Sequence, residues 1–122
     1  MSVVEVKNMD ALKALFASHT YVAIDFYATW CPPCKMISPI FEKLAAAHAA
    51  DEVFAFAKIN VDEVREAAAA YNVTAMPTFM FFKEGQQVAV NGHKLIRGAD
   101  VNALTGAMEK LGGLAKKRLA EL

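Results

Sequence analysis

Apolar and polar positions along the chain alternate between stretches with the helical period and continuous or alternating apolar runs typical of strands. Residues 21–28 are almost all apolar, which predicts a strand buried on both faces. Residues 33–49 follow with Ile37, Phe41 and Leu44 on one helical stripe, interrupted by Pro39, which is expected to kink the helix. The remaining expected elements are strands at 3–6, 53–59, 78–82, 87–90 and 94–97, and helices at about 9–18, 63–71 and 101–111. Alternating strands and helices indicate an α/β domain.

Polar residues and glycines mark the expected ends of these elements. Asn8, Asp62 and Asp100 each precede a helical stretch and are predicted to act as N-caps. Turns are predicted at 83–86, where Gly85 can adopt positive φ, and at the Asn91-Gly92 pair. Gly112 and Gly113 are expected to stop the last helix, with residues 114–122 forming one more short helix or a frayed end.

Length and charge exclude several classes of function. A chain of 122 residues fits one domain, assigned here to 1–122 with a core at about 3–111 and a C-terminal extension at 112–122. Thirteen basic and thirteen acidic side chains balance, so bulk charge indicates no nucleic-acid or membrane partner. The first residues show no basic segment followed by an apolar run, and a cytoplasmic location is therefore expected.

The segment Trp30-Cys31-Pro32-Pro33-Cys34-Lys35 holds both cysteines and the only tryptophan. On the first turn of a helix, residues three apart are neighbours, so the two thiols are within reach of a disulfide. The start of a helix also favours an anion, here the Cys31 thiolate. This spacing, in a chain expected to lack an export signal, indicates a working redox pair.

The two cysteines have two other interpretations. A tetrahedral zinc site needs about four ligands, and only His19, His48 and His93 remain, none in a paired ligand spacing. No metal is therefore expected. The cysteines would also be inert if both were buried structural residues, whereas reactive cysteines belong in electropositive, partly exposed sites.

Asp25 is the one charged residue of its strand. Burial disfavours an ionised carboxylate, so its pKa is expected to rise, and a base that titrates near neutral pH can take the proton from Cys34 through water. The other interpretation is an Asp25 turned to solvent on an edge strand.

Pro32 and Pro33 remove two backbone N–H groups from the motif and restrict the residues before them. The helix is therefore predicted to begin near Pro33, with the Cys34 N–H donating to Cys31. A stiffer turn, with a reduction potential different from that of a Gly-Pro motif, is expected.

Five motifs in order resemble those of the thioredoxin family over about residues 3–111. They are 25–28 (DFYA), 30–35 (WCPPCK), 57–62 (AKINVD), 76–78 (MPT) and 82–85 (FKEG). The resemblance implies a thioredoxin fold, a central mixed β-sheet flanked by helices on both faces. Three features depart from the family: the Pro-Pro dipeptide, which is found in tryparedoxins and nucleoredoxin-like proteins; Tyr27 in place of tryptophan; and a segment at 86–97 that is longer by roughly five residues. The last two are expected to affect only surface and packing.

The resemblance also implies roles for individual residues. Cys31 would be the exposed nucleophile and Cys34 the resolving thiol, with Asp25 as base and Lys58 close enough to tune its charge, unless Lys58 is a plain surface lysine. Pro77 would be a cis-proline that faces the cysteines and leaves the Met76 backbone free to pair with substrate; an ordinary trans-proline was the alternative. The expected docking surface consists of Trp30, Pro32, Pro33, Met76, Pro77, Gly98 and Ala99, although Trp30 would also fit as an ordinary packed side chain.

The implied function is a monomeric protein disulfide reductase with no cofactor beyond its own Cys31–Cys34 disulfide. Its implied partners are an NADPH-dependent thioredoxin reductase and disulfide-containing proteins such as peroxiredoxins. Three alternatives stay open: a tryparedoxin-like electron donor to peroxidases, recharged by a low-molecular-weight thiol; a binding or chaperone module that does not use the thiols; and a secreted oxidase or isomerase.

Overall fold

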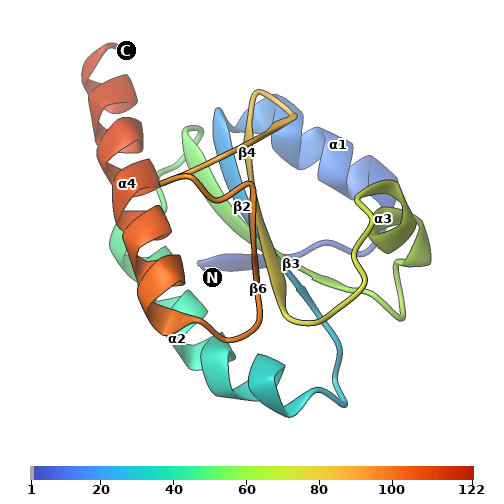
Figure 1. Ribbon diagram of the computed structural model, residues 1–122. Coiled ribbons are helices and arrows are strands. Elements are labelled where there is room, and N and C mark those ends of the chain that lie inside the picture. Colours follow the sequence, from blue (N-terminus) through green and yellow to red (C-terminus); the bar gives the residue numbers. More distant parts are fainter. Residues whose placement is uncertain (1) are drawn as a thin grey trace.

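The computed structural model describes residues 2–122 and shows a central sheet with helices on both faces (Figure 1). The strands are β1 (Val3–Glu5), β2 (Tyr21–Tyr27), β3 (Phe54–Asn60), β4 (Thr78–Lys83), β5 (Gln86–Val88) and β6 (Leu95–Arg97). The helices are α1 (Met9–Ser18), α2 (Pro32–His48), α3 (Arg65–Ala70) and α4 (Val101–Ala120).

The sheet is mixed, as expected, and β2 lies at its centre. The strand order is β1-β3-β2-β4-β5, with β6 also paired to β4. Strands β1, β3 and β2 run parallel, whereas β4 is antiparallel to β2 and to its other neighbours β5 and β6. The end of β2 leads directly into the cysteine motif, so the central strand of the sheet positions the candidate site.

Two apolar layers cover the two faces of β2. Helices α2 and α4 pack with Ala23 and its neighbours on one face, and α1 and α3 pack with Ile24 and Phe26 on the other (Figure 1). Side chains alternate along a strand, so Asp25 belongs to the same face as Ala23, beneath α2 and α4. The predicted burial of this strand on both faces is confirmed.

Two of the three predicted N-caps are confirmed. Asn8 accepts a hydrogen bond from the Ala11 N–H at 2.8 Å, and Asp100 accepts one from the Ala103 N–H at 3.0 Å. The prediction for Asp62 is wrong: α3 begins only at Arg65, and its N-cap residue makes no side-chain hydrogen bond. The carboxylate of Asp62 has a partner from a distant part of the chain, described below.

The long segment after β4 forms one edge of the sheet in two pieces. Val88 of β5 pairs with Phe81, and Leu95 of β6 pairs with the neighbouring residue Met80. Residues 89–94, which lie between these two pairs, therefore do not pair with β4. The predicted turn is confirmed, with φ of 51° at Asn91 and 81° at Gly92. The additional residues therefore form a small excursion in an edge strand.

Helix α4 does not stop at Gly112 and Gly113, contrary to the prediction; it continues to Ala120. Gly112 is buried against His48 at the end of α2, where an added Cβ would lie 2.9 Å from the ring carbon Cγ and closer still to Nδ1. Leu111 and Ala115 are also buried, so packing holds the helix through the glycine pair. Gly112 is needed here for close approach, and the C-terminal extension is part of α4.

Gly112→Ala is expected to lower the free energy of unfolding by about 1–3 kcal/mol, because the new methyl group overlaps the His48 ring. In a His48→Ala background the same substitution should instead stabilise the protein by about 0.5–1 kcal/mol, since alanine is the better helix residue. Urea unfolding of the four proteins measures both effects. An equal effect of Gly112→Ala in the two backgrounds would contradict this account.

Candidate active site

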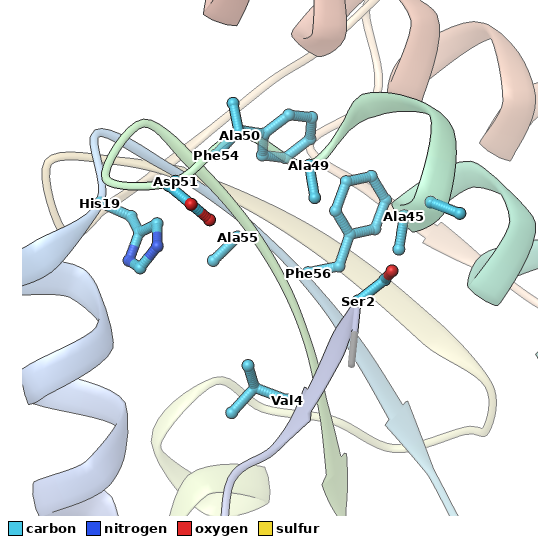
Figure 2. Close-up of a pocket in the computed structure, with 11 residues that line it drawn as sticks. Ser2, Val4, His19, Ala45, Ala49, Ala50, Asp51, Phe54, Ala55 and Phe56 are labelled. Atoms are coloured by element: carbon cyan, nitrogen blue, oxygen red, sulfur yellow. The ribbon is translucent and has the colours of Figure 1, made fainter.

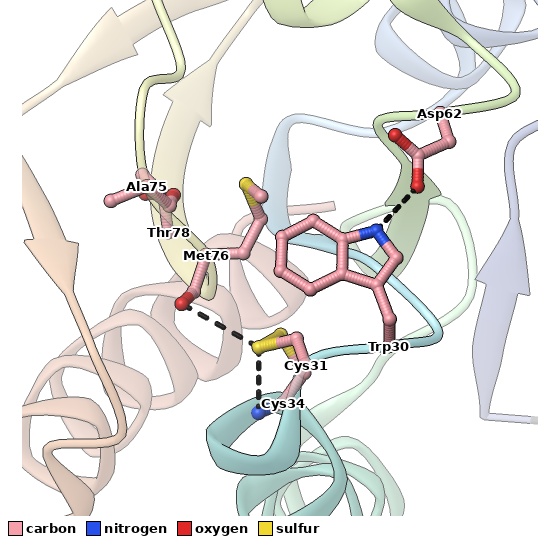
Figure 3. Close-up of a disulfide and its surroundings, with 7 residues drawn as sticks. All are labelled: Trp30, Cys31, Cys34, Asp62, Ala75, Met76 and Thr78. Carbon is pink, nitrogen blue, oxygen red and sulfur yellow. Dashed lines mark hydrogen bonds between the residues drawn. A yellow bond between two sulfur atoms is a disulfide. The ribbon is translucent and has the colours of Figure 1, made fainter.

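The two cysteines form a disulfide at the start of α2 (Figure 3). Cys31 is the N-cap residue, Pro32 and Pro33 occupy the first two helical positions, and the Cys34 N–H donates to Cys31 Sγ at 3.2 Å. The predicted donor is confirmed, although the helix begins at Pro32, one residue earlier than expected. In the reduced protein, this N–H and the helix N-terminus would stabilise a thiolate at Cys31.

Cys31 is less accessible than the resemblance implied. Its exposed fraction is 3%, and that of Cys34 is 4%, so the expectation of an exposed nucleophile is wrong for this disulfide-bonded form. The reason is local packing: both residues and Ala28 form a small buried cluster that Tyr27, Val61 and Met76 partly cover.

The loop before β4 lies against the disulfide. The Met76–Pro77 peptide bond is cis, as the resemblance implied, and the Met76 carbonyl oxygen lies 3.6 Å from Cys31 Sγ (Figure 3). The Gly98 N–H donates to the Pro77 carbonyl oxygen at 2.8 Å. This hydrogen bond places Gly98, and Ala99 after it, beside the loop that contacts the cysteines.

Trp30 lies at the surface, with 64% of its side chain exposed, and is not an ordinary packed tryptophan. Its indole N–H donates to Asp62 Oδ2 at 2.9 Å (Figure 3), and the backbone N–H of Asp62 is itself held by Asn60. Pro32 and Pro33 are exposed beside the disulfide. The N-cap prediction for Asp62 was wrong because an aspartate before a helical stretch has the same sequence pattern as an N-cap.

Asp25 is buried, with an exposed fraction of 4%, so the solvent-facing interpretation is wrong. Its Oδ1 atom has no hydrogen-bond partner among the residues that the structure describes. Burial raises the pKa of Asp25 from 3.8 to about 7, while the charge of Lys58 lowers it and that of Glu5 raises it. This carboxyl therefore exchanges its proton near neutral pH.

Lys58 lies between two acidic residues in the sheet. It is in register with Asp25 on β2 and with Glu5 on β1, and its Nζ atom is 3.9 Å from Glu5 Oε1. The Tyr27 hydroxyl donates to both Glu5 oxygens, at 2.8 and 3.1 Å, and Lys58 Nζ lies 5.6 Å from the centre of the Tyr27 ring. Burial and the Glu5 hydrogen bond raise the pKa of Tyr27. The expectation that Tyr27 affects only surface and packing missed this hydroxyl and its partner.

One surface hollow lies beside the cysteines, and a second lies away from them. One of about 370 Å³ lies beside Cys34 and is also lined by Tyr27, Lys35 and Pro39. Another, of about 360 Å³, lies at the opposite end of the parallel strands, where Ala45 of α2 and its C-cap residue Ala49 face Phe54 and Phe56 of β3 (Figure 2). The second hollow contains none of the predicted site residues.

The described residues, 2–122, contain no group of three or more His, Cys, Asp or Glu side chains placed to hold a metal ion. Among them there is also no helix with the length and apolar character needed to cross a bilayer.

The arrangement supports exchange between a dithiol and a disulfide. Two cysteines already joined by a bond accept two electrons on reduction and return them on oxidation. The helix N-terminus favours a thiolate at one of them, and a carboxyl with a pKa of about 7 is buried on the strand that leads into the motif.

Comparison with known proteins gives the same chemistry. The thioredoxin family model matches residues 2–109. A thioredoxin-like protein of Fusarium culmorum is 58% identical over 115 residues, covering 94% of this chain and 95% of that protein. A thioredoxin of Neurospora crassa is 56% identical over 100 residues, covering 82% and 79%. The solved structure of a Malassezia sympodialis thioredoxin is 40% identical, covers 90% of each chain and superposes with a TM-score of 0.79.

The matched family, the mixed sheet with helices on both faces and the paired cysteines all indicate the same family and the same chemistry. The chain belongs to the thioredoxin family and is a thiol–disulfide oxidoreductase that reduces protein disulfides through Cys31 and Cys34.

Proposed function

We propose that Cys31 is the attacking thiolate. The observation that carries this assignment is the position of Cys31 at the N-cap of α2, where its sulfur accepts the Cys34 N–H. The Cys31 thiolate attacks one sulfur of a substrate disulfide, forms a mixed disulfide and releases the other substrate sulfur as a thiolate. Cys34 lies one turn further along the helix, and neither Pro32 nor Pro33 can donate an N–H to it.

Cys34 then resolves the mixed disulfide. Its thiol passes a proton to the Asp25 carboxylate through water, and the resulting thiolate attacks Cys31 Sγ. The second substrate sulfur leaves with the electron pair of the broken bond, and the internal disulfide forms. The substrate has gained two electrons, and the Cys31–Cys34 pair has lost two. The proposed docking surface for substrates beside the disulfide consists of Trp30, Pro32, Pro33, Met76, Pro77, Gly98 and Ala99.

An NADPH-dependent thioredoxin reductase is the proposed source of electrons, and disulfide-containing proteins such as peroxiredoxins are the proposed acceptors. Support for a peroxiredoxin as acceptor comes from a related solved structure, 37% identical with a TM-score of 0.75, whose subject is thiol resolution in a yeast mitochondrial 1-Cys peroxiredoxin through glutathione/thioredoxin systems. We propose a monomer as the working form. The cytoplasmic location stays a prediction, for which cell fractionation is the test.

The Pro32-Pro33 dipeptide favours a second candidate source of electrons, the low-molecular-weight thiol that recharges tryparedoxins. Reduction of insulin disulfides, supported either by NADPH with thioredoxin reductase or by a low-molecular-weight thiol, separates the two. Efficient turnover with the reductase and slow turnover with the small thiol is expected. The reverse order would replace the proposed partner with a tryparedoxin-type cycle.

A further inference from the structure

Three charged side chains lie in register across the parallel part of the sheet: Glu5 on β1, Lys58 on β3 and Asp25 on β2. Partners in register point to the same face, so the Lys58 ammonium is placed between two carboxyl groups. Its recorded ion pair is with Glu5, at 3.9 Å, while Oδ1 of the buried Asp25 has no hydrogen-bond partner among the described residues. Glu5 and Asp25 thus flank Lys58 on opposite sides in the sheet, and the ion pair that Lys58 makes is the one with Glu5.

Tyr27 holds Glu5 in this position. Its hydroxyl donates to both carboxylate oxygens, and its ring lies 5.6 Å from Lys58 Nζ, within the range of a cation–π contact. Tyr27 and Asp25 are two residues apart on β2, so they lie on the same face. One side chain thus contacts both members of the ion pair next to the buried carboxyl.

We propose that Glu5 and Tyr27 are positioning residues that hold the Lys58 ammonium near Glu5 and so limit how strongly Lys58 stabilises the Asp25 carboxylate. This inference rests on the proposed role of Asp25 as the base for Cys34. Without the Glu5 charge, Asp25 would be the one carboxyl group in register with Lys58, and the ionised form of Asp25 would become easier to reach.

The other charged groups around the site are few. Lys35 on α2 lines the hollow that Tyr27 and Cys34 share, and Glu63, after β3, acts on Tyr27. The charges that act on Asp25 itself are those of Lys58 and Glu5. Strand β4 places the uncharged Phe79 opposite Asp25. Cys34 becomes titratable only when the disulfide is reduced.

Two variants separate the effect of the Glu5 charge from that of the Tyr27–Glu5 hydrogen bonds. Glu5→Gln removes the charge but keeps an oxygen that can accept the Tyr27 hydrogen bond, whereas Tyr27→Phe removes that hydrogen bond and keeps the ring. Glu5→Gln is expected to lower the pKa of Asp25 by roughly half a unit to one unit, the range for one charge about two strand spacings away. Tyr27→Phe is expected to lower the pKa by less. Because Tyr27 acts through Glu5, the double variant should match Glu5→Gln alone.

The readout is the Asp25 carboxyl carbon signal, followed by NMR across a pH titration of each reduced protein. Glu109→Gln is the matched control, since it removes one carboxylate from α4, and it should leave the Asp25 titration unchanged. An unchanged Asp25 pKa in Glu5→Gln, or additive shifts in the double variant, would overturn the inference. A merely structural role for the pair would change stability without moving the titration.

Insulin reduction at the same pH values tests the proposed function separately. The acidic limb of the rate profile is expected to move to lower pH by the same amount as the NMR titration. If the titration also moves in Tyr27→Phe, which keeps the Glu5 charge, and the rate profile does not move, the positioning of Lys58 stands and the role of Asp25 as base fails. If Glu5→Gln does not fold, Tyr27→Phe alone decides the inference through the same titration.

Discussion

Asp25→Asn is expected to raise the free energy of unfolding by about 4 kcal/mol at pH 9 and by little at pH 4. In the folded protein, burial raises the pKa of Asp25 from 3.8 to about 7, so the folded state binds a proton that the unfolded chain has released. Stability is therefore lost as pH rises from about 4 to about 7, and the loss is complete above that range. Asparagine does not ionise, so the free energy of unfolding of the variant does not fall in this way as pH rises.

The same substitution should slow insulin reduction at pH 7 by up to about 100-fold, because the proposed base is missing. Urea unfolding at several pH values measures the first effect, and the pH–rate profile measures the second. Asp51→Asn, which removes an exposed carboxylate, is the control and should change neither. A stability difference that does not grow between pH 4 and pH 7 would show that Asp25 is not buried as described, and an unchanged rate profile would exclude it as the base.

Cys31→Ser is expected to reduce disulfide reductase turnover by roughly three orders of magnitude or more, because a serine hydroxyl is a poor nucleophile at neutral pH. The fold should persist, since serine can still accept the Cys34 N–H as an N-cap. The NADPH-coupled insulin assay measures the loss, and circular dichroism checks the fold. Retained biological function in this variant, or in one that also carries Cys34→Ser, would favour a binding module that does not use the thiols.

The parts of the fold that were predictable from the sequence depend on interactions close along the chain. The apolar run that became β2, the N-caps Asn8 and Asp100, and the Cys34 N–H contact with Cys31 are all local patterns. Each has a physical cause that operates within a few residues, which explains why simple spacing rules found it.

The features that were missed or predicted wrongly depend on contacts between distant residues. Asp62 binds the Trp30 indole, 32 residues earlier in the chain, and so does not cap α3. Gly112 stays helical because α2 and α4 meet there through His48. The Tyr27 hydroxyl donates to Glu5, which lies 22 residues earlier in the chain, and the sequence alone could not reveal this contact. The disulfide is also more deeply buried than its motif suggested, because the loop at Met76 packs against it.

The chain has two cysteines, so each single serine variant leaves one thiol and shows which sulfur attacks. The most direct measurement is the rate at which each reduced variant forms a mixed disulfide with insulin, followed by mass spectrometry. Cys34→Ser is expected to form the adduct rapidly at Cys31 and hold it, whereas Cys31→Ser should form it at least about 100-fold more slowly. Adduct formation at Cys34 as fast as at Cys31, or none at either, would contradict reduction of disulfides by the Cys31 thiolate.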